Sequence, residues 1–304
     1  MRRVAFLLVL GLALAACGDD GGGGDAAPTD STVGDTSAPT DTGGPTDSST
    51  STDSSGPDVS IDAGDAGGGD LWRPSPGTSW QWQLSGDIDT SIDVEMYDID
   101  LFDTPQATID ALHAEGRIVI CYFSAGSYED WRDDEGDFPM SALGDPLDGW
   151  PGERWVDVRD AGVRAVMTAR LDLAVMKGCD GVEPDNVDGY QNDSGFPLSP
   201  ADQLDYNRFL AREAHARGLS VGLKNDLDQV PDLVGDFDWA LNEECVEYDE
   251  CVALVPFIDA GKAVFHVEYG GASIAARVCA VTQPLGLDTL IKRLELDAFR
   301  VTCP

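Results

Sequence analysis

From Trp80 onward the sequence alternates between short apolar segments typical of β-strands and longer segments typical of helices. The expected strands are WQWQLSG (80–86), VEMYDID (94–100), RIVICYFSAGS (117–127), CDGVEPD (179–185), LSVGLKND (219–226), FDWALNEE (237–244), KAVFHVEY (262–269) and a last one within residues 287–301. Helices are expected over residues 104–116, 163–177, 199–218 and, more briefly, 249–261. Repeated strand-then-helix order predicts a parallel sheet, and about eight strands in one domain favour a single (β/α)8 TIM barrel over a doubly wound sheet.

The expected strands end in polar or ionisable residues behind apolar bodies. In a barrel these ends converge on one face, where the βα loops build the active site. Wet loops would explain one or two such ends, but carboxylates at nearly every one predict an acid-lined pocket. The residues concerned, which we take as candidates for substrate binding or catalysis, are Asp98, Glu183, Asp185, Asp188, Lys224, Asp226, Glu243, Glu244, His266 and Glu268.

Several chemistries are disfavoured by the motifs. The three histidines form no HExxH or similar pair for zinc, and there is no GxSxG elbow for a serine hydrolase. A calcium loop starting at Asp185 fails at Val187 and Gly189, where oxygen ligands are needed. No Walker-type loop or dinucleotide fingerprint occurs. We therefore expect no metal and no cofactor.

Paired-carboxylate chemistry is the remaining candidate. Glycoside hydrolysis needs one carboxyl group to protonate the leaving oxygen and a second to attack the anomeric carbon or activate water. The best pair lies in EPD (183–185) and NEE (242–244). Aromatic residues near the strand ends would suit stacking on sugar faces, although core packing explains any single one equally well; those of interest are Trp82, Tyr97, Tyr122, Tyr128, Trp131, Trp155, Tyr190 and Tyr269.

The first seventy residues differ in kind from the rest. Residues 1–16 combine two arginines with a thirteen-residue apolar run, and LAAC (14–17) resembles a bacterial lipobox, which predicts a signal peptide and lipidation at Cys17. Residues 17–70 are Gly-, Asp-, Ser- and Thr-rich and lack lysine, arginine and aromatic residues, which predicts a disordered linker. An exported protein held to a membrane by lipid chains is expected, with residues 71–304 as the barrel.

Cysteines and charge constrain the exported domain further. Six cysteines beyond Cys17 predict three disulfides; sequence proximity favours Cys245–Cys251 and Cys279–Cys303, which leaves Cys121 and Cys179 on two expected strands. The chain carries a formal charge of −37, of which −27 falls on residues 71–304. Such a surface repels nucleic acid and favours cationic partners, although general solubility would explain it as well. A monomer is expected.

Five blocks in order, CYFSAGSYEDWR, WPGERWVDVRD, GCDGVEPDNVDGY, NEECVEYDEC and GKAVFHVEY, resemble glycoside hydrolase family 114, the endo-α-1,4-polygalactosaminidases. The resemblance spans residues 80–303 and implies a (β/α)8 barrel that cleaves α-1,4-linked galactosamine polymers. It also implies a nucleophile at the end of strand 4 and an acid/base at the end of strand 6, which here are Asp185 and Glu243. Residue alternation alone leaves Glu243 or Glu244 open, since they point opposite ways.

Two other functions stay open at this stage. The chain would serve as a non-catalytic polysaccharide-binding lipoprotein if the carboxylates only bind. It would act on a neutral α-galactoside if the acidic surface has no role in substrate choice.

Overall fold

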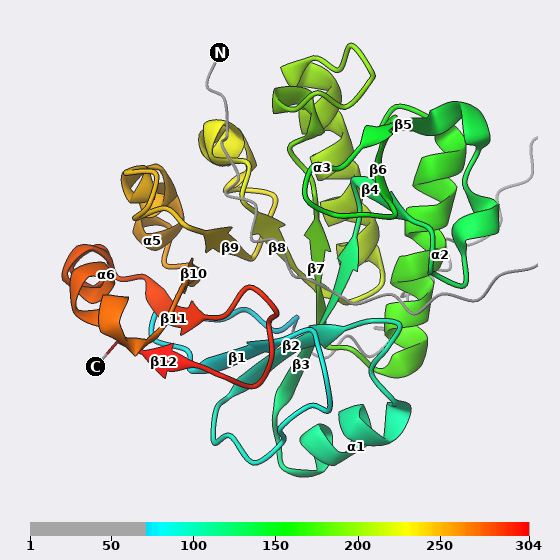
Figure 1. Cartoon of the computed structure of the whole chain (residues 1–304). Helices are drawn as coiled ribbons and strands as arrows, with labels where there is room; N and C mark the ends of the chain where they lie inside the picture. Colours follow the sequence, from blue (N-terminus) through cyan, green and yellow to red (C-terminus); the bar gives the residue numbers. More distant parts are fainter. Residues whose placement is uncertain (1–70, 304) are drawn as a thin grey trace, which may run out of the picture. The chain divides into compact units, whose positions relative to one another are not determined.

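A computed structural model describes residues 71–303. The expected signal peptide, Cys17 and the linker up to residue 70 lie outside these residues. The centre of the fold is a curled sheet of eight parallel strands that are adjacent in chain order (Figure 1). The strands are β1 (Trp80–Gln83), β2 (Met96–Asp100), β3 (Ile118–Ser124), β7 (Gly181–Asp185), β8 (Ser220–Lys224), β9 (Trp239–Glu243), β10 (Val264–Tyr269) and β11 (Asp288–Lys292).

The strands are apolar on both faces because the sheet curls around one core and carries helices outside it. The inner cluster, which we define as the side chains packed inside the curl, includes Trp82, Trp239 and Phe265. A larger outer cluster packs the opposite strand faces against the helices. The helices are α1 (Gln106–Ala114), α2 (Ala161–Lys177), α3 (Pro200–Ala216), α4 (Val230–Leu233), α5 (Val255–Asp259) and α6 (Ala275–Thr282) (Figure 1).

The expected closed barrel is not found, because no ladder joins β1 to β11 within residues 71–303. The free edge of β11 is instead taken by an antiparallel strand, β12 (Val301–Thr302). The segment before β12 also contacts β1, since Arg300 Nη2 donates to the Trp80 carbonyl at 2.9 Å and Gln81 Nε2 donates to the Ala298 carbonyl at 3.2 Å. The C-terminal segment therefore fills the seam, and the prediction was right about the eight parallel strands and wrong about closure.

Most of residues 127–156 lie outside the strands and helices expected from the sequence, yet they contain a small antiparallel sheet. Its strands run in the order β4 (Ser127–Glu129), β6 (Glu153–Val156), β5 (Leu143–Pro146), and they lie beside α2 in Figure 1. Sequence patterning missed it because its strands have three or four residues each and are rich in charged and turn-forming residues. Buried ion pairs fix it to the main sheet: Arg132 Nη2 lies 2.7 Å from Asp100 Oδ2, and Arg132 Nε lies 2.9 Å from Glu129 Oε1.

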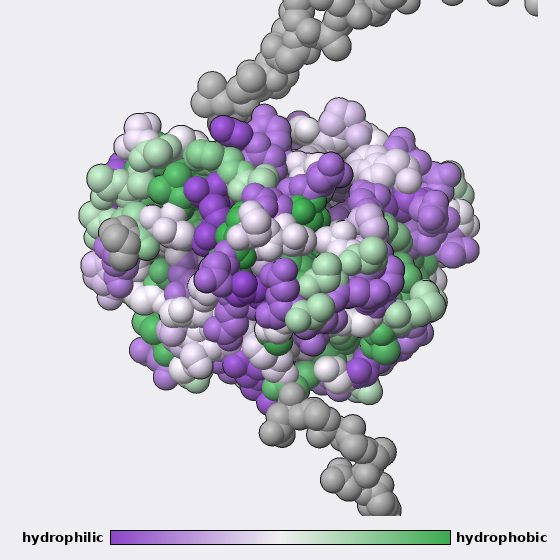
Figure 2. Space-filling model, turned by 90° about the horizontal axis from the view of Figure 1, so that it is seen from below, coloured by the Kyte–Doolittle hydropathy of each residue, from purple (hydrophilic) through white to green (hydrophobic). Residues whose placement is uncertain are grey.

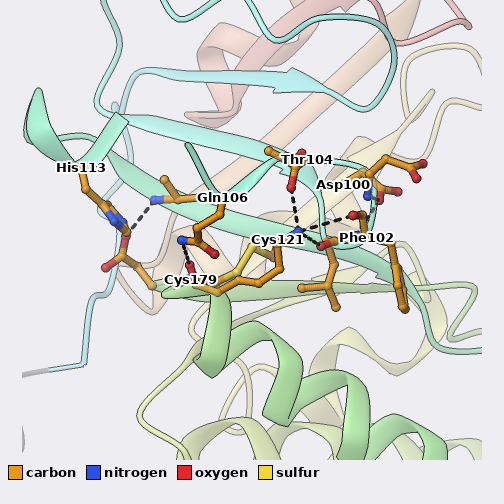
Figure 3. The surroundings of a disulfide bond; sticks show 12 residues. Asp100, Phe102, Thr104, Gln106, His113, Cys121 and Cys179 are labelled. Atoms are coloured by element: carbon orange, nitrogen blue, oxygen red, sulfur yellow. Dashed lines mark hydrogen bonds and ion pairs between the residues drawn. A yellow bond between two sulfur atoms is a disulfide. The ribbon is translucent and has the colours of Figure 1, made fainter. Parts of the chain in front are cut away.

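The three expected disulfides are confirmed as Cys121–Cys179, Cys245–Cys251 and Cys279–Cys303. The first joins Cys121 on β3 to Cys179, which lies two residues before β7 (Figure 3). In the same region Lys177 Nζ donates to the carbonyls of Leu101 at 2.6 Å and Thr104 at 2.7 Å. The Thr104 carbonyl thus accepts a hydrogen bond from Lys177. Helix α1 begins after Pro105, and no side chain caps its N-terminus.

None of the helices in residues 71–303 is long and apolar enough to cross a bilayer.

Candidate active site

Three neighbouring strands, β7, β8 and β9, end in Asp185, Lys224 and Glu243. Lys224 lies between the two acids, with its Nζ 3.1 Å from Asp185 Oδ1 and 3.3 Å from Glu243 Oε2. Its side chain is almost fully buried, while those of the two acids are partly exposed at 18% and 24%. One buried cation therefore holds two accessible carboxylates at the ends of the strands on either side of it.

A second layer of acids lies deeper inside the curl. Glu183 Oε1 accepts from Lys224 Nζ at 2.9 Å and Glu183 Oε2 accepts from Trp82 Nε1 at 3.1 Å. Burial raises the pKa of Glu183 to about 7. Burial and the neighbouring charge of Glu183 raise the pKa of Asp98 well above its usual range, which favours its protonated form.

The two mouth carboxylates are each oriented by a tyrosine. Tyr122 donates to Asp185 Oδ2 at 3.1 Å, and Tyr269 donates to Glu243 Oε1. Asn225 holds Glu243 from a second side, because its Nδ2 donates to Glu243 Oε2 at 3.1 Å and its Oδ1 accepts from the Glu243 amide at 2.9 Å. These bonds fix each carboxylate in one orientation, as catalysis by positioned groups requires.

The chain turns sharply immediately after each of these three strands. Asn186, Asn225 and Glu244 all have positive φ, at 59°, 49° and 60°. Non-glycine residues seldom adopt this conformation, and such strain concentrates at functional sites. Gly126 permits the turn after β7: a Cβ there would lie 1.6 Å from the Asn186 carbonyl oxygen. The turns let Asp185 and Glu243 stay at the strand ends rather than move away in the loops.

A third group of acids lies beyond Asp185, where Asp188 and Asp226 come near one another. Asp226 is 2% exposed, and its Oδ2 accepts from Asn207 Nδ2 at 2.8 Å. Among residues 71–303, no group donates a hydrogen bond to its Oδ1. Burial and the charge of Asp188 raise the pKa of Asp226 to about 8, and burial and the charge of Asp185 raise the pKa of Asp188 to about 6. Tyr190, half-buried, interacts with Asp226. Lys224 lowers the pKa of Asp188, but by less than burial and Asp185 raise it.

The structure does not bring every predicted residue to this cluster. On β10 the inner cluster contains Phe265 and Val267, so His266 and Glu268 lie on the other strand face. There His266 Nε2 is 3.3 Å from Glu268 Oε1, and Glu268 Oε1 accepts from the Val246 amide at 2.7 Å. His266 and Glu268 are both buried, and Glu268 holds the loop after β9 through the Val246 amide.

Glu244 and Trp155 also lie apart from the Lys224 contacts. Glu244 follows the strand end, with burial and the charge of Glu243 raising its pKa to about 7. Trp155, 7% exposed, packs beneath Gly189, where a Cβ would lie 3.3 Å from the indole ring. Of the predicted residues, Asp98, Tyr122, Glu183, Asp185, Lys224, Glu243 and Tyr269 form the connected cluster, and Asp188, Tyr190 and Asp226 adjoin it.

Two residues of the site, Asn186 and Asn225, were not selected as candidates from the sequence. Trp82 was noted there, but its hydrogen bond to Glu183 was not predicted. Asn225 carries a signal, since it stands between a strand-ending lysine and an aspartate, and asparagine tolerates positive φ. Trp82 reaches Glu183 from β1 across the inside of the curl, a contact over 101 positions of sequence that no local pattern records.

A group of possible metal ligands, Cys245, Cys251 and His266, comes together on the outer face. The two cysteines form a disulfide, so neither offers a thiolate, and the group does not fit a metal.

The raised carboxyl pKa values predict how stability depends on pH. Asp226, Glu183 and Asp188 bind protons more tightly in the folded chain than unfolded. The free energy of unfolding should therefore fall as pH rises from about 4 to about 8, because the unfolded chain releases these protons first. Urea denaturation at several pH values measures this slope. Asp226→Asn, which mimics the protonated group, should make the slope shallower, whereas Asp232→Asn, at an exposed acid, should not; an unchanged slope in Asp226→Asn would contradict the burial argument.

The chain is similar to known glycoside hydrolases in both sequence and fold. The model of glycoside-hydrolase family GH114 matches residues 63–304. The crystal structure of Aspergillus fumigatus Ega3 in complex with galactosamine is 46% identical, with a TM-score of 0.74 over 76% of this chain and 97% of that one. The glycoside hydrolase domain of PelA from Pseudomonas aeruginosa shares the fold at 14% identity and a TM-score of 0.60, over 74% of this chain and 98% of that one. A Deinococcus radiodurans protein with no assigned function is 28% identical over 260 residues, which are 74% of this chain and 83% of that protein. The chain belongs to glycoside-hydrolase family GH114 and is a glycosidase.

Proposed function

We propose that the enzyme cleaves α-1,4-linked galactosamine polymers internally, with Asp185 as nucleophile and Glu243 as general acid/base. The observation that carries this proposal is the pair of accessible carboxylates held by one lysine at the ends of β7 and β9. Asp185 attacks the anomeric carbon while Glu243 gives a proton to the leaving oxygen. Water, deprotonated by Glu243, then releases the glycosyl group from Asp185.

The spacing supports retention of anomeric configuration. One oxygen of each carboxylate contacts the same Lys224 nitrogen, at 3.1 Å and 3.3 Å, so the distance between these two oxygens cannot exceed the sum of the two contacts. That limit, which applies to one oxygen of each carboxylate, admits the roughly 5–5.5 Å separation typical of retaining enzymes.

The acidic groups support a cationic substrate. The charge of Asp185 raises the pKa of the neighbouring Asp188, and a 2-ammonium group on the sugar would favour the ionised form of Asp188. Hydrophilic residues cover much of the surface in Figure 2, and the domain's charge of −27 would attract a polycationic chain from a distance. The 46% identical Ega3 structure, which contains galactosamine, is consistent with this substrate.

The decisive experiment offers one polymer in two charge states. Partly deacetylated galactosaminogalactan should yield new reducing ends, and chemical re-acetylation of the same sample should lower the rate, because the ammonium groups are then lost. Polymer binding without release of reducing ends would instead favour the non-catalytic polysaccharide-binding protein. Faster cleavage of acetylated or neutral galactan would favour the neutral-substrate enzyme.

We also propose that the enzyme works outside the cytoplasm as a monomer, anchored by lipid at Cys17. Three disulfides in the described domain support an oxidising compartment. Metabolic labelling with a fatty-acid analogue tests the anchor, and Cys17→Ser should abolish the label.

A further inference from the structure

A second feature suited to saccharides lies on the small antiparallel sheet, outside the carboxylate cluster. Two tryptophans there are unusually open, with Trp131 51% exposed and Trp150 46% exposed. Trp131 follows β4, and Trp150 is in the turn between β5 and β6, where its amide donates to the Leu147 carbonyl at 3.2 Å. Large aromatic side chains exposed in this way have a cost in water and mark binding surfaces when they gather.

One part of the Trp131 ring lies against Gly152. Gly152, with a φ of +96°, lies directly beneath it: a Cβ there would be 2.8 Å from an atom of the six-membered ring. The same Cβ would be 2.6 Å from Asp130 Oδ1, so the indole and this carboxylate sit side by side over one glycine. The Asp130 amide donates to the Gly152 carbonyl at 3.1 Å, which fixes the backbone on both sides. Gly152 is also only two residues from Trp150.

The exposed charges near these tryptophans in the chain are mostly acidic. Arg132 is buried against Asp100 and Glu129, and the half-buried Arg154 on β6 donates to the Gly144 carbonyl at 2.9 Å. The exposed acids of this segment include Asp130, Asp133, Asp145 and Asp148. An aromatic face takes the apolar face of a sugar ring, and a cation over it gains further attraction, while an adjacent carboxylate pairs with an ammonium group.

The small sheet is tied to the catalytic strand end. Ser127, the first residue of β4, is 2.6 Å from Ser124 at the end of β3, and Asn186 Nδ2 donates to Ser124 Oγ at 2.9 Å. Asn186 directly follows Asp185. Trp131 is four residues from Ser127, hence at most about 14 Å away along the chain. A polymer leaving the cleft on this side could reach the tryptophans.

We propose that Trp131, Trp150 and Asp130 form an outer saccharide-binding platform that holds a length of cationic amino-sugar chain while another part is cut. The proposal rests on the proposed function, because the platform's ligand is the same polymer. It adds a site that acts only on long chains. Short oligomers, which occupy the cleft alone, gain nothing from it.

The test compares long partly deacetylated galactosaminogalactan with short galactosamine oligomers. Trp131→Ala should raise KM for the polymer by about two- to fivefold, the scale of exposed cation–aromatic contacts, and leave kcat and KM for the oligomer unchanged. Asp130→Asn should act in the same direction. Matched controls are Met140→Ala, an exposed apolar residue on the same insertion, and Asp137→Asn; both should match wild type. Polymer retardation in affinity gels, measured in an Asp185→Asn background, should weaken in step.

The possible outcomes separate the two proposals. Equal polymer KM in Trp131→Ala and wild type, with active wild type, would refute the platform and leave the proposed function standing. An equal rise in KM for oligomer and polymer would also refute it, since the tryptophan would then belong to the cleft. If wild type neither binds nor cleaves the polymer, both proposals are wrong. Thermal melting checks that each variant is folded. A rise in polymer KM counts as an effect of the platform only in a variant whose melting curve is native.

Discussion

Replacing Asp185 with asparagine is expected to lower kcat on the galactosamine polymer by about 10⁴- to 10⁶-fold, the scale seen when a covalent nucleophile is removed. The amide keeps the shape and can still accept from Tyr122, which donates to Asp185 Oδ2 at 3.1 Å, but it cannot attack the anomeric carbon. Binding of the polymer should persist. Reducing-end assays and affinity gels measure the two effects separately, and a native melting curve confirms folding.

Azide distinguishes the two carboxylate roles under the retaining mechanism. With an activated α-glycoside, azide in the space vacated in Asp185→Ala attacks the opposite face and should give a β-glycosyl azide. In Glu243→Ala it attacks the glycosyl–enzyme intermediate and should give the α product. Near wild-type activity in Asp185→Asn, or the same azide anomer from both variants, would contradict the assignment. Asp180→Asn is a suitable control, because Asp180 pairs with His113 of α1, away from the Lys224 contacts.

Replacing Lys224 with methionine is expected to affect both stability and activity. Lys224 Nζ contacts Glu183, Asp185 and Glu243, and its side chain is 1% exposed, so its loss leaves several acids without their counter-charge. Breaking a buried ion pair from one side costs about 3–5 kcal/mol of unfolding free energy. The cost should be larger at pH 8 than at pH 5, because the remaining acids then cannot relieve their repulsion by binding protons. Denaturant melts at both pH values measure it.

Lys177→Met is the matched control for Lys224→Met. Lys177 donates only to backbone carbonyls, so its loss should lower stability by less and without a strong pH dependence. The kcat of Lys177→Met should equal that of wild type, whereas Lys224→Met should lose about 10²-fold or more because the two proposed catalytic carboxylates lose their positioning contact. A pH-independent cost in Lys224→Met equal to that of Lys177→Met would show that the carboxylates do not depend on this cation.

Local pattern was sufficient for the strands, the main helices and the cysteine pairs. Apolar strand bodies followed by polar ends indicate both a parallel sheet and its functional edge, because carboxyl ends of parallel strands share one side. Asp185 and Lys224 could be named for this reason. The small sheet between β3 and β7 could not be predicted, since strands of three or four residues carry too little periodicity.

The sequence by itself determined the order of elements, the acidic character of the mouth and the candidate carboxylates, since each depends on residues near one another in the chain. Only the tertiary structure decided which face of β10 turns inward, because both faces of a covered parallel strand are buried; Phe265 and Val267 face the inner cluster, and His266 and Glu268 do not. It also decided that the C-terminal segment fills the seam between β1 and β11. The contact of Lys224 with three acids from two other strands is of the same kind: it arises because β8 pairs with β7 on one side and β9 on the other, which no local period records.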